Sequence, residues 1–476
     1  MKKNSILTMI FALASAFTIS ASSCSMIGGA FGGTSSQESS IQEESSETSG
    51  TSEESKTSEK PETPETPDSS NTSDSSDTSD TSESPEVPEK PEDNALTVLT
   101  KGEVFPYIEN IKNYLQAGAG AKVGDYYKTV ATQCAPVQIK WQFEKTGARK
   151  FLVEYATKED FSDAQSVEAG ATKRSVDVYN LYKSTTYYVR VTALNAKQEA
   201  LYTAKGEFYT TDLGPRFMKI DDVRNVRDLG GYKTSSGKTL VQGIAYRGGG
   251  LTVPPKGGQP NEISEDGKKY MSEVMGIKSE IDFRTANESG ITLEQGSVIP
   301  GATLTYITIN AYAYTFDYDD EYLQFFTMLA DKNNYPFYIH CTGGADRTGS
   351  AIFLLHTMLG VSDLECLQGF ELTSFSSYGL RDTQSSDSYK DSWDAFMAKL
   401  DTYAGNTKQE KVETWVRSIG VTQTQIDAIK AIFYGETAVE IKSNAPVAVS
   451  SVVEKKTAAQ QYLEVLSGWA IQKKEN

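Results

Sequence analysis

Residues 340–349 carry the groups of this chain that could do chemistry, and they read HCTGGADRTG. Cys341 and Arg347 have five residues between them, and Gly344 follows the cysteine by three. Apolar runs before and after this segment predict a strand, a tight loop and a helix. A helix N-terminus presents unpaired N–H groups and partial positive charge, so it binds phosphate and favours the thiolate of a nearby cysteine. The loop therefore predicts a site for phosphoryl transfer.

Each residue type in this loop has a role in that chemistry. Cys341 is the predicted nucleophile, which attacks phosphorus to form a cysteinyl-phosphate. Arg347 is predicted to bind phosphate oxygens with its planar fork, a task that lysine performs less well. We expect Thr348 to reach the Cys341 sulfur with its hydroxyl, and His340 to hold loop carbonyls and favour the thiolate. The predicted phosphate cradle consists of Thr342, Gly343, Gly344, Ala345, Asp346 and Arg347.

The leaving oxygen must receive a proton, and two placements of the general acid stay open. Asp346 lies inside the loop and is the preferred candidate. The alternatives lie 21 to 24 residues upstream of Cys341, in a Tyr- and Asp-rich stretch that could be a mobile loop: Asp317, Asp319 and Asp320. For at least two of them we expect a structural role, in a solvated acidic turn before a helix at 322–330.

The composition argues against other chemistries. The only two histidines are His340 and His356. His356 would lie about 22 Å from Cys341 along a helix, and a strand would turn His340 away from that cysteine. A cysteine–histidine hydrolase is therefore not expected, and the histidines and cysteines have no zinc-ligand spacing. The predicted site needs no metal and no cofactor.

The formal net charge of −18 comes mainly from one segment. Residues 35–95 hold 18 Asp and Glu against 3 Lys, a net charge of −15, which leaves −3 for the rest. Because the remainder is nearly balanced, no nucleic-acid partner is expected.

The N-terminus resembles a bacterial lipoprotein signal. Lysines at 2 and 3, an apolar stretch at 6–19 and small residues at 20–23 lead to Cys24. Ala21 departs from the pattern, because leucine is commoner there, and a plain secretory signal or a retained anchor is the alternative. The resemblance implies a signal peptide over residues 1–23 and a lipidated Cys24. It also implies a position outside the cytoplasm, with the protein lipid-anchored to the bacterial cell membrane.

The other segments outside the folded part are a linker and a tail. Residues 24–97 are rich in Ser, Thr, Glu and Pro, which predicts a disordered stalk. The tail over residues 437–476 has no assigned role. No stretch after the signal has the roughly 18 to 20 apolar residues that span a bilayer.

Cys134 and Cys366 are expected to be inert buried thiols. A disulfide between Cys341 and Cys366 under oxidising conditions is an alternative, and it would switch the site off.

Residues 98–213 are predicted to form a small β-sandwich with an N-terminal extension. Alternating runs predict strands at 137–141, 151–155, 175–179 and 186–191. Trp141, and Leu181 followed by Tyr187, resemble the core residues of a fibronectin type III domain, which implies a spacer or docking surface. The extension, with a short helix expected within 104–115, has no assigned function.

Residues 214–436 change to a mixed α/β pattern, with helices predicted at 347–359, 412–419 and 423–433. Their loop HCTGGADRTG resembles the HCxxGxxR[ST]G signature of the protein tyrosine phosphatase superfamily. It is most similar to the bacterial tyrosine/lipid phosphatase group, whose loop reads HCxxGKDRTG. Four further segments resemble that group: NVRDLGGY at 225–232, IAYR at 244–247, IDFR at 281–284 and the helix pair at 412–433.

The resemblance implies that Cys341 is the nucleophile, Asp346 the general acid and Arg347 the phosphate-binding residue. Ala345 stands where the group has lysine, which weakens the expectation of a lipid substrate. Gly248 stands where the group has serine. Recurrent positions that we interpret as scaffold, because buried Asp–Arg pairs commonly brace loops, are Asn225, Arg227, Asp228, Asp282 and Arg284.

The sequence thus predicts an α/β catalytic domain of cysteine-phosphatase type behind a small all-β, fibronectin III-like sandwich and a disordered N-terminal stalk. The expected function is hydrolysis of phosphomonoesters. Phosphotyrosine is the preferred substrate, and the partner is a phosphorylated protein or a small phosphomonoester. An inositol phosphate or phosphoinositide phosphatase is the alternative enzyme. A catalytically silent surface protein for binding or adhesion is the alternative of another class.

Overall fold

The computed structural model describes residues 95–128, 130, 132–252, 262–385 and 388–440. Cys24, the signal, nearly all of the stalk and most of the C-terminal tail lie outside these residues. Among the residues described, none of the helices combines the length and apolarity that a membrane crossing requires.

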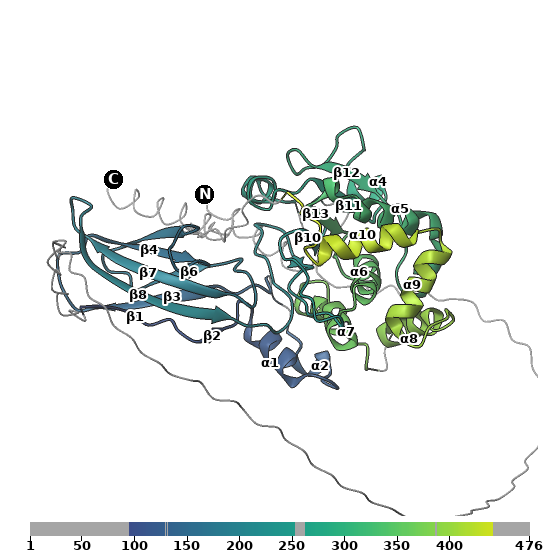
Figure 1. Cartoon of the computed structure of the whole chain (residues 1–476), viewed down its shortest axis with the longest axis horizontal. Coiled ribbons are helices and arrows are strands. Elements are labelled where there is room, and N and C mark those ends of the chain that lie inside the picture. The colour runs from purple at the N-terminus through teal and green to yellow at the C-terminus, as the bar shows by residue number, and fades with distance from the viewer. Residues whose placement is uncertain (1–94, 129, 131, 253–261, 386–387, 441–476) are drawn as a thin grey trace, which may run out of the picture. The chain divides into compact units, whose positions relative to one another are not determined.

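Residues 96–210 form two β-sheets (Figure 1). The first sheet has the order β1-β3-β6, with β1 Leu96–Val98, β3 Val137–Phe143 and β6 Ser175–Val178. The second has the order β2-β8-β7-β4-β5, with β2 Glu103–Val104, β8 Ala200–Thr210, β7 Thr186–Leu194, β4 Lys150–Ala156 and β5 Gln165–Gly170.

The two sheets share one apolar core, because alternate side chains of each strand point to the same face. Trp141, Leu181 and Tyr187 are buried in it. The four predicted runs coincide with β3, β4, β6 and β7, and the structure adds β1, β2, β5 and β8. Most of β8 is exposed or half-buried, so its sequence lacks the apolar face that identifies a strand. The fibronectin resemblance stays a prediction.

The extension contains two helices, α1 Glu109–Ala117 and α2 Val123–Tyr126. The helix expected within 104–115 thus begins later, because residues 103–104 pair with β8 as strand β2.

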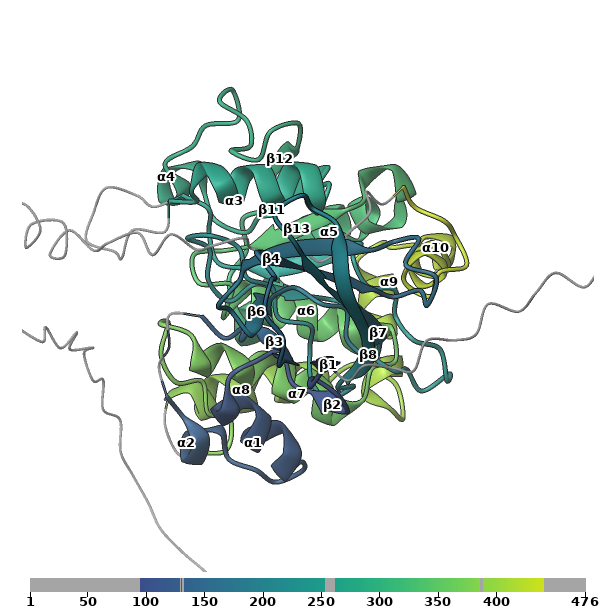
Figure 2. The same ribbon diagram turned by 90° about the vertical axis from the view of Figure 1, so that its left-hand side faces the viewer.

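A five-stranded sheet of order β12-β11-β13-β10-β9 lies at the centre of the residues that follow (Figure 2). Its strands are β9 Arg227–Asp228, β10 Ala245–Gly248, β11 Ser279–Asp282, β12 Thr303–Tyr306 and β13 Phe337–His340. β10, β11, β12 and β13 run parallel, and β9 is antiparallel to β10.

Helices pack on both faces of this sheet. Ile339 contributes to a large core with α5 Asp319–Ala330, α6 Arg347–Met358, α9 Lys408–Ser418 and α10 Gln423–Phe433. Tyr338, one residue earlier, faces a second core with the π-helix η1 Tyr270–Val274, which continues directly from α3 Glu265–Lys269. The other elements are α4 Ala286–Ser289, α7 Asp363–Glu371, α8 Ser388–Leu400, and the 3₁₀ turns η2 Tyr312–Asp317, η3 Lys332–Asn334 and η4 Leu372–Phe375.

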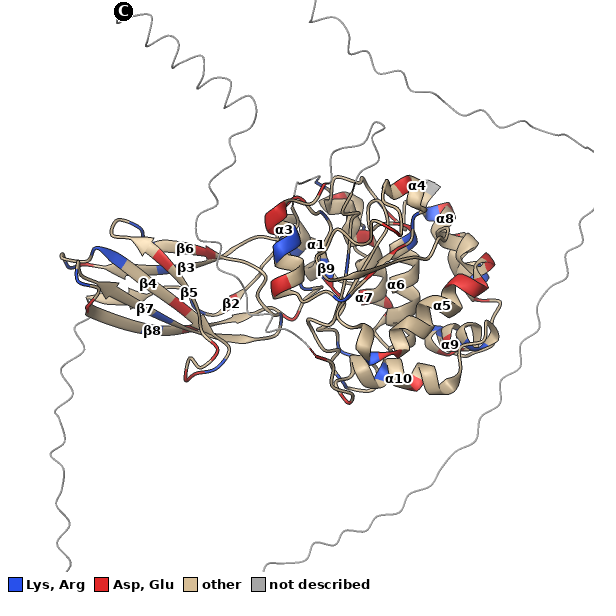
Figure 3. Cartoon of the chain, turned by 90° about the horizontal axis from the view of Figure 1, so that it is seen from above, with Lys and Arg blue, Asp and Glu red and all other residues tan. Residues whose placement is uncertain are grey.

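The parallel strands bring their carboxyl ends to one edge of the sheet. His340, the last residue of β13, is in register with Gly248 at the end of β10 and with Asp282 at the end of β11. In open α/β sheets, ligands bind at this edge. Lys and Arg are interspersed with Asp and Glu over the ribbon, in agreement with the nearly balanced charge of the residues that follow the stalk (Figure 3).

Candidate active site

The loop between β13 and α6 is held from outside through its carbonyl oxygens. Asn225 Nδ2 donates to the carbonyl of Gly343 at 3.0 Å, and Arg247 Nη2 donates to that of Gly344 at 2.6 Å. Gly344 has a φ of +62°, and a Cβ there would lie 2.0 Å from the carbonyl oxygen of Gly248. Only glycine can take that conformation so close to a neighbouring strand.

Two further loop carbonyls are bound. The Gly250 amide donates to Thr342 O at 3.0 Å, and the Ser350 amide, in the first turn of α6, donates to Asp346 O at 2.8 Å. Within the described part of the chain, by contrast, the amides of residues 342–346 donate to no protein group. Since the carbonyls are taken from outside, unpaired N–H groups remain for an anion at the centre of the loop.

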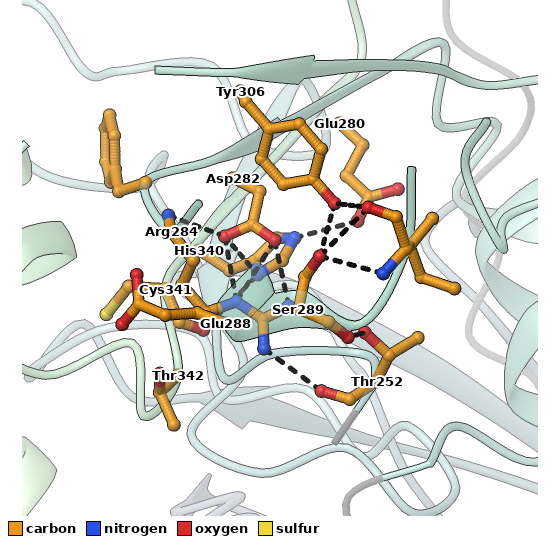
Figure 4. Close-up of polar contacts among 12 residues, drawn as sticks. Thr252, Glu280, Asp282, Arg284, Glu288, Ser289, Tyr306, His340, Cys341 and Thr342 are labelled. Atoms are coloured by element: carbon orange, nitrogen blue, oxygen red, sulfur yellow. Dashed lines mark hydrogen bonds and ion pairs between the residues drawn. The ribbon is translucent and has the colours of Figure 1, made fainter. Parts of the chain in front are cut away.

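A buried charge network supports the start of the loop (Figure 4). His340 Nε2 lies 2.8 Å from Glu280 Oε1, and its Nδ1 lies 3.3 Å from the carbonyl oxygen of Cys341. Asp282 accepts from Nε and Nη2 of Arg284 at 2.8–3.1 Å. Burial would raise the pKa of Asp282, but the charge of His340 and the Arg284 hydrogen bonds hold it below its ordinary value. The expected contact of His340 with a loop carbonyl is therefore present.

Glu288 fixes the guanidinium of Arg347. Arg347 Nη1 donates to Glu288 Oε2 at 3.0 Å, and Nη2 donates to Oε1 at 3.1 Å. Glu288 is itself held, because it closes a capping box with Thr285 at the start of α4. The Nε–H of Arg347 makes no hydrogen bond with a described residue, so it is available to a phosphate oxygen.

Cys341 lies among three arginine side chains. Burial alone would lower the pKa of Arg347, but its bonds to Glu288 and the negative charge of Cys341 raise it above the ordinary value. Burial would also lower the pKa of Arg284, but its hydrogen bonds to Asp282 and the charges of Asp282 and Cys341 raise it above the ordinary value. Burial lowers the pKa of Arg247 to about 10, against the charges of Tyr232, Cys341 and Asp346. Positive charge around the sulfur favours a bound phosphate.

Asp346 is bound by two side chains from outside the loop. Tyr312 donates its hydroxyl to Oδ1 at 2.6 Å. Arg381 donates to Oδ1 from Nε at 3.2 Å and to Oδ2 from Nη2 at 3.1 Å. Burial, followed by the Asp346 charge, raises the pKa of Tyr312, so this phenol stays protonated and acts as the donor.

The three upstream aspartates lie at a helix start. Asp317 ends η2, and Asp319 and Asp320 form the first turn of α5, where carboxylates complement the helix dipole. Burial, followed by the charges of Asp319 and Asp317, raises the pKa of Tyr403.

Replacing Asp346 by Asn tests the two placements directly. If Asp346 is the general acid, Asp346→Asn lowers kcat for an alkyl phosphate by about 10²- to 10³-fold, and much less for p-nitrophenyl phosphate, whose leaving group needs no proton. Asp319→Asn is the matched control, since it changes an exposed aspartate on α5. A large loss with Asp319→Asn and a small one with Asp346→Asn would reverse the assignment.

The structure corrects one expectation and argues against one alternative. Thr348 Oγ1 is buried and makes no hydrogen bond with a described residue, so the expected contact with the Cys341 sulfur is not formed. Cys134 and Cys366 are buried free thiols, as expected, and Cys366 Sγ lies 3.7 Å from Thr357 Oγ1, in the last turn of α6. Cys341 precedes that helix, whose 12 residues span roughly 18 Å, so the two thiols are too far apart for the alternative disulfide.

The second histidine takes no part in the site. His356 is buried on α6, with Nε2 3.0 Å from the carbonyl oxygen of Leu229. Burial lowers its pKa to about 3, so it is neutral.

The residues interpreted as scaffold brace the loop, but Asp228 and the neighbouring Arg227 do not pair with each other. Asp282 pairs with Arg284, whereas Asp228 pairs with Arg216 at 3.0 Å. Arg227 donates instead to Gly369 O and Thr373 Oγ1, at 2.7 and 3.1 Å. The sequence reading assigns no role to five residues that contact the loop: Arg247, Glu288, Tyr312, Tyr378 and Arg381.

Two of these five carry a signal in the sequence. Glu288 stands three residues after Thr285, the spacing of a capping box, and Arg247 stands in one of the matched segments. Ala345, where the group has lysine, is buried. In the described ranges no group of three or more His, Cys, Asp or Glu side chains could hold a metal ion.

Comparison with known proteins supports a phosphatase assignment for this part of the chain. A family model described as "Tyrosine phosphatase family" matches residues 218–435, which include the sheet, the loop and α6. The match supports a phosphatase of the cysteine type. No curated protein matches the chain. A solved structure titled "Myokine structure" is 18% identical over 17% of this chain and 99% of its own, with a TM-score of 0.14, a likeness too small to support an inference.

Proposed function

We propose that this protein is a cysteine-dependent protein tyrosine phosphatase. Cys341 attacks the phosphorus of a phosphotyrosine, the bond to the phenolic oxygen breaks, and the leaving oxygen takes a proton from a carboxylic acid, for which Asp346 is preferred. Water then attacks the cysteinyl-phosphate and releases inorganic phosphate and the thiol. The observation that carries the proposal is a loop with its carbonyls bound from outside, its amides unpaired and an arginine fork held beside its cysteine.

The arrangement favours an aryl phosphate of moderate charge over a highly anionic substrate. Ala345 supplies no side-chain charge where a lysine would add one. Arg381, a further cation in contact with the loop, is neutralised by its pair with Asp346. A polyphosphorylated inositol or phosphoinositide would need additional positive charge to balance its extra phosphates.

A substrate panel at fixed pH and ionic strength tests the proposal. We expect kcat/KM for a phosphotyrosine peptide to exceed the values for a phosphoserine peptide, an inositol phosphate and a phosphoinositide by about tenfold or more. Trapping by rapid acid quench and peptide mass spectrometry is expected to find the phosphate on Cys341. Preference for the inositol compounds would favour the alternative enzyme, and no hydrolysis of any substrate under reducing conditions would favour a silent binding protein.

We further propose that the enzyme acts at the outer face of a bacterial membrane, tethered through a lipid on Cys24. The support is the sequence of residues 1–24 and the acidic, proline-containing stalk that follows. Metabolic labelling with a fatty acid is expected to mark the wild type and not Cys24→Ser, and equal labelling of both would contradict the anchor.

A further inference from the structure

Residues 371–383 form a loop that is closed at its base by one buried carboxylate. Glu371, the last residue of α7, is fully buried. Its Oε1 accepts from the amide of Thr383 at 3.0 Å and from the hydroxyl of the same residue at 2.5 Å. The two ends of the loop are therefore tied together.

The far part of this loop holds the candidate catalytic loop. The Tyr378 ring packs on Gly343, where a Cβ would lie 3.0 Å from Tyr378 Cγ. Arg381 forms the ion pair with Asp346 at 3.1 Å. Thr373 accepts from Asn225, the same side chain that binds the carbonyl of Gly343. Any displacement of residues 371–383 would therefore shift side chains that contact the phosphate cradle.

The base of the loop is held by the N-terminal extension. Tyr114 on α1 donates its hydroxyl to Glu371 Oε2. Gln133 Nε2 donates to the carbonyl of Leu372 at 2.6 Å, and Gln384 Nε2 donates to the carbonyl of Ala121 at 2.7 Å. Both views of the ribbon place α1 and α2 beside α7 (Figures 1 and 2).

An apolar cluster makes this attachment rigid. It joins the extension to Leu372 and Phe375 of η4, and all its members are buried: Tyr107, Ile111, Tyr114, Leu115, Val123, Cys134, Phe217, Leu372 and Phe375. Burying these side chains together favours one position of the loop over others.

We propose that residues 105–128 and 132–135 are a positioning element for the phosphatase site, acting through Glu371, the loop 371–383 and Arg381 on Asp346. This inference rests on the proposed function and gives a role to the extension, which the sequence leaves without one. Tyr114 is the key positioning residue, because its hydroxyl is the direct hydrogen bond between α1 and the carboxylate that closes the loop.

A double-mutant cycle tests the inference in the full chain. Tyr114→Phe removes only the hydroxyl, and we expect kcat for an alkyl phosphate, whose leaving group needs the proton, to fall about fivefold with KM changed less than twofold. Arg381→Gln removes the link to Asp346. If the extension acts through that link, Tyr114→Phe causes little further loss of kcat in the Arg381→Gln background.

Tyr126→Phe is the matched control. Its ring contacts that of Tyr114 on the same extension, with centroids 5.9 Å apart, but its hydroxyl bonds to no described residue. We expect wild-type kcat for this variant. Gln384→Ala, which removes the bond to Ala121, provides a second variant with a loss in the same direction. Additive effects in the cycle, or equal effects of Tyr114→Phe and Tyr126→Phe, would overturn the inference.

The inference and the proposed function fail in different ways. Hydrolysis by the wild type tests the function, whereas the cycle tests only the route from the extension to the site. If the wild type hydrolyses nothing, the same cycle is measured as the rate of Cys341 alkylation by iodoacetamide, which reports the surroundings of the sulfur.

Discussion

Cys341→Ser is expected to lower kcat for a phosphotyrosine peptide by about 10⁴-fold or more. A serine hydroxyl fills almost the same space as the thiol, but it is not ionised near neutral pH and no histidine base is in reach. His340 is bound to Glu280 and His356 to a backbone carbonyl, so neither can activate a hydroxyl at position 341. Stopped assays with the peptide measure kcat, and isothermal titration measures binding.

Binding of the peptide should survive this substitution. The unpaired amides and the Arg347 fork remain, so the dissociation constant is expected to stay within about tenfold of the wild-type KM. Cys366→Ser is the matched control, because Cys366 is buried on α7 beside the far end of α6, where its sulfur accepts from Thr357 and donates to the carbonyl of Val361. Retention of more than a tenth of wild-type kcat by Cys341→Ser would remove the basis of the proposed function.

Arg347→Lys is expected to lower kcat/KM by about 10³-fold. The substitution keeps one positive charge but loses the planar fork, so two phosphate oxygens can no longer be bound side by side. It also breaks the paired hydrogen bonds through which Glu288 fixes the guanidinium, at 3.0 and 3.1 Å. A lysine ammonium would be drawn toward that carboxylate and away from the phosphate.

The control for this substitution is Arg417→Lys. Arg417 lies on α9 and donates to Gln423 near the protein surface, so we expect wild-type kcat/KM. Steady-state kinetics on both variants, with thermal unfolding to confirm that each is folded, measure the difference. A loss below about tenfold for Arg347→Lys would mean that simple positive charge suffices, and the fork would have no special part in the reaction.

The sequence predicts well the features that are local in the chain. The helices expected at 347–359 and 423–433 appear as Arg347–Met358 and Gln423–Phe433, because their apolar spacing and their end signals lie within the segment itself. The strands β3, β4, β6 and β7 follow from alternation for the same reason. Asp319 and Asp320 instead join the first turn of α5, where acidic residues are stabilised by the helix dipole.

Contacts between distant segments could not be predicted in this way. Glu288 reaches Arg347 from α4, Arg381 reaches Asp346 from beyond α7, and Tyr312 reaches the same aspartate from η2. Each pairing depends on how the chain crosses the sheet, and no spacing within one segment encodes it. The position of the extension against Glu371 depends on packing in the same way.

By itself the sequence determined the reactive groups: a cysteine, an arginine and glycines in one contiguous turn between a strand and a helix, where local backbone geometry is enough to place them. The tertiary structure alone decided which side chains hold that turn open, because the donors to its carbonyls come from separate segments that meet only when the sheet edge forms. Reactive residues that are neighbours in the chain can be identified from the sequence, whereas the contacts that keep the loop amides unpaired depend on long-range packing.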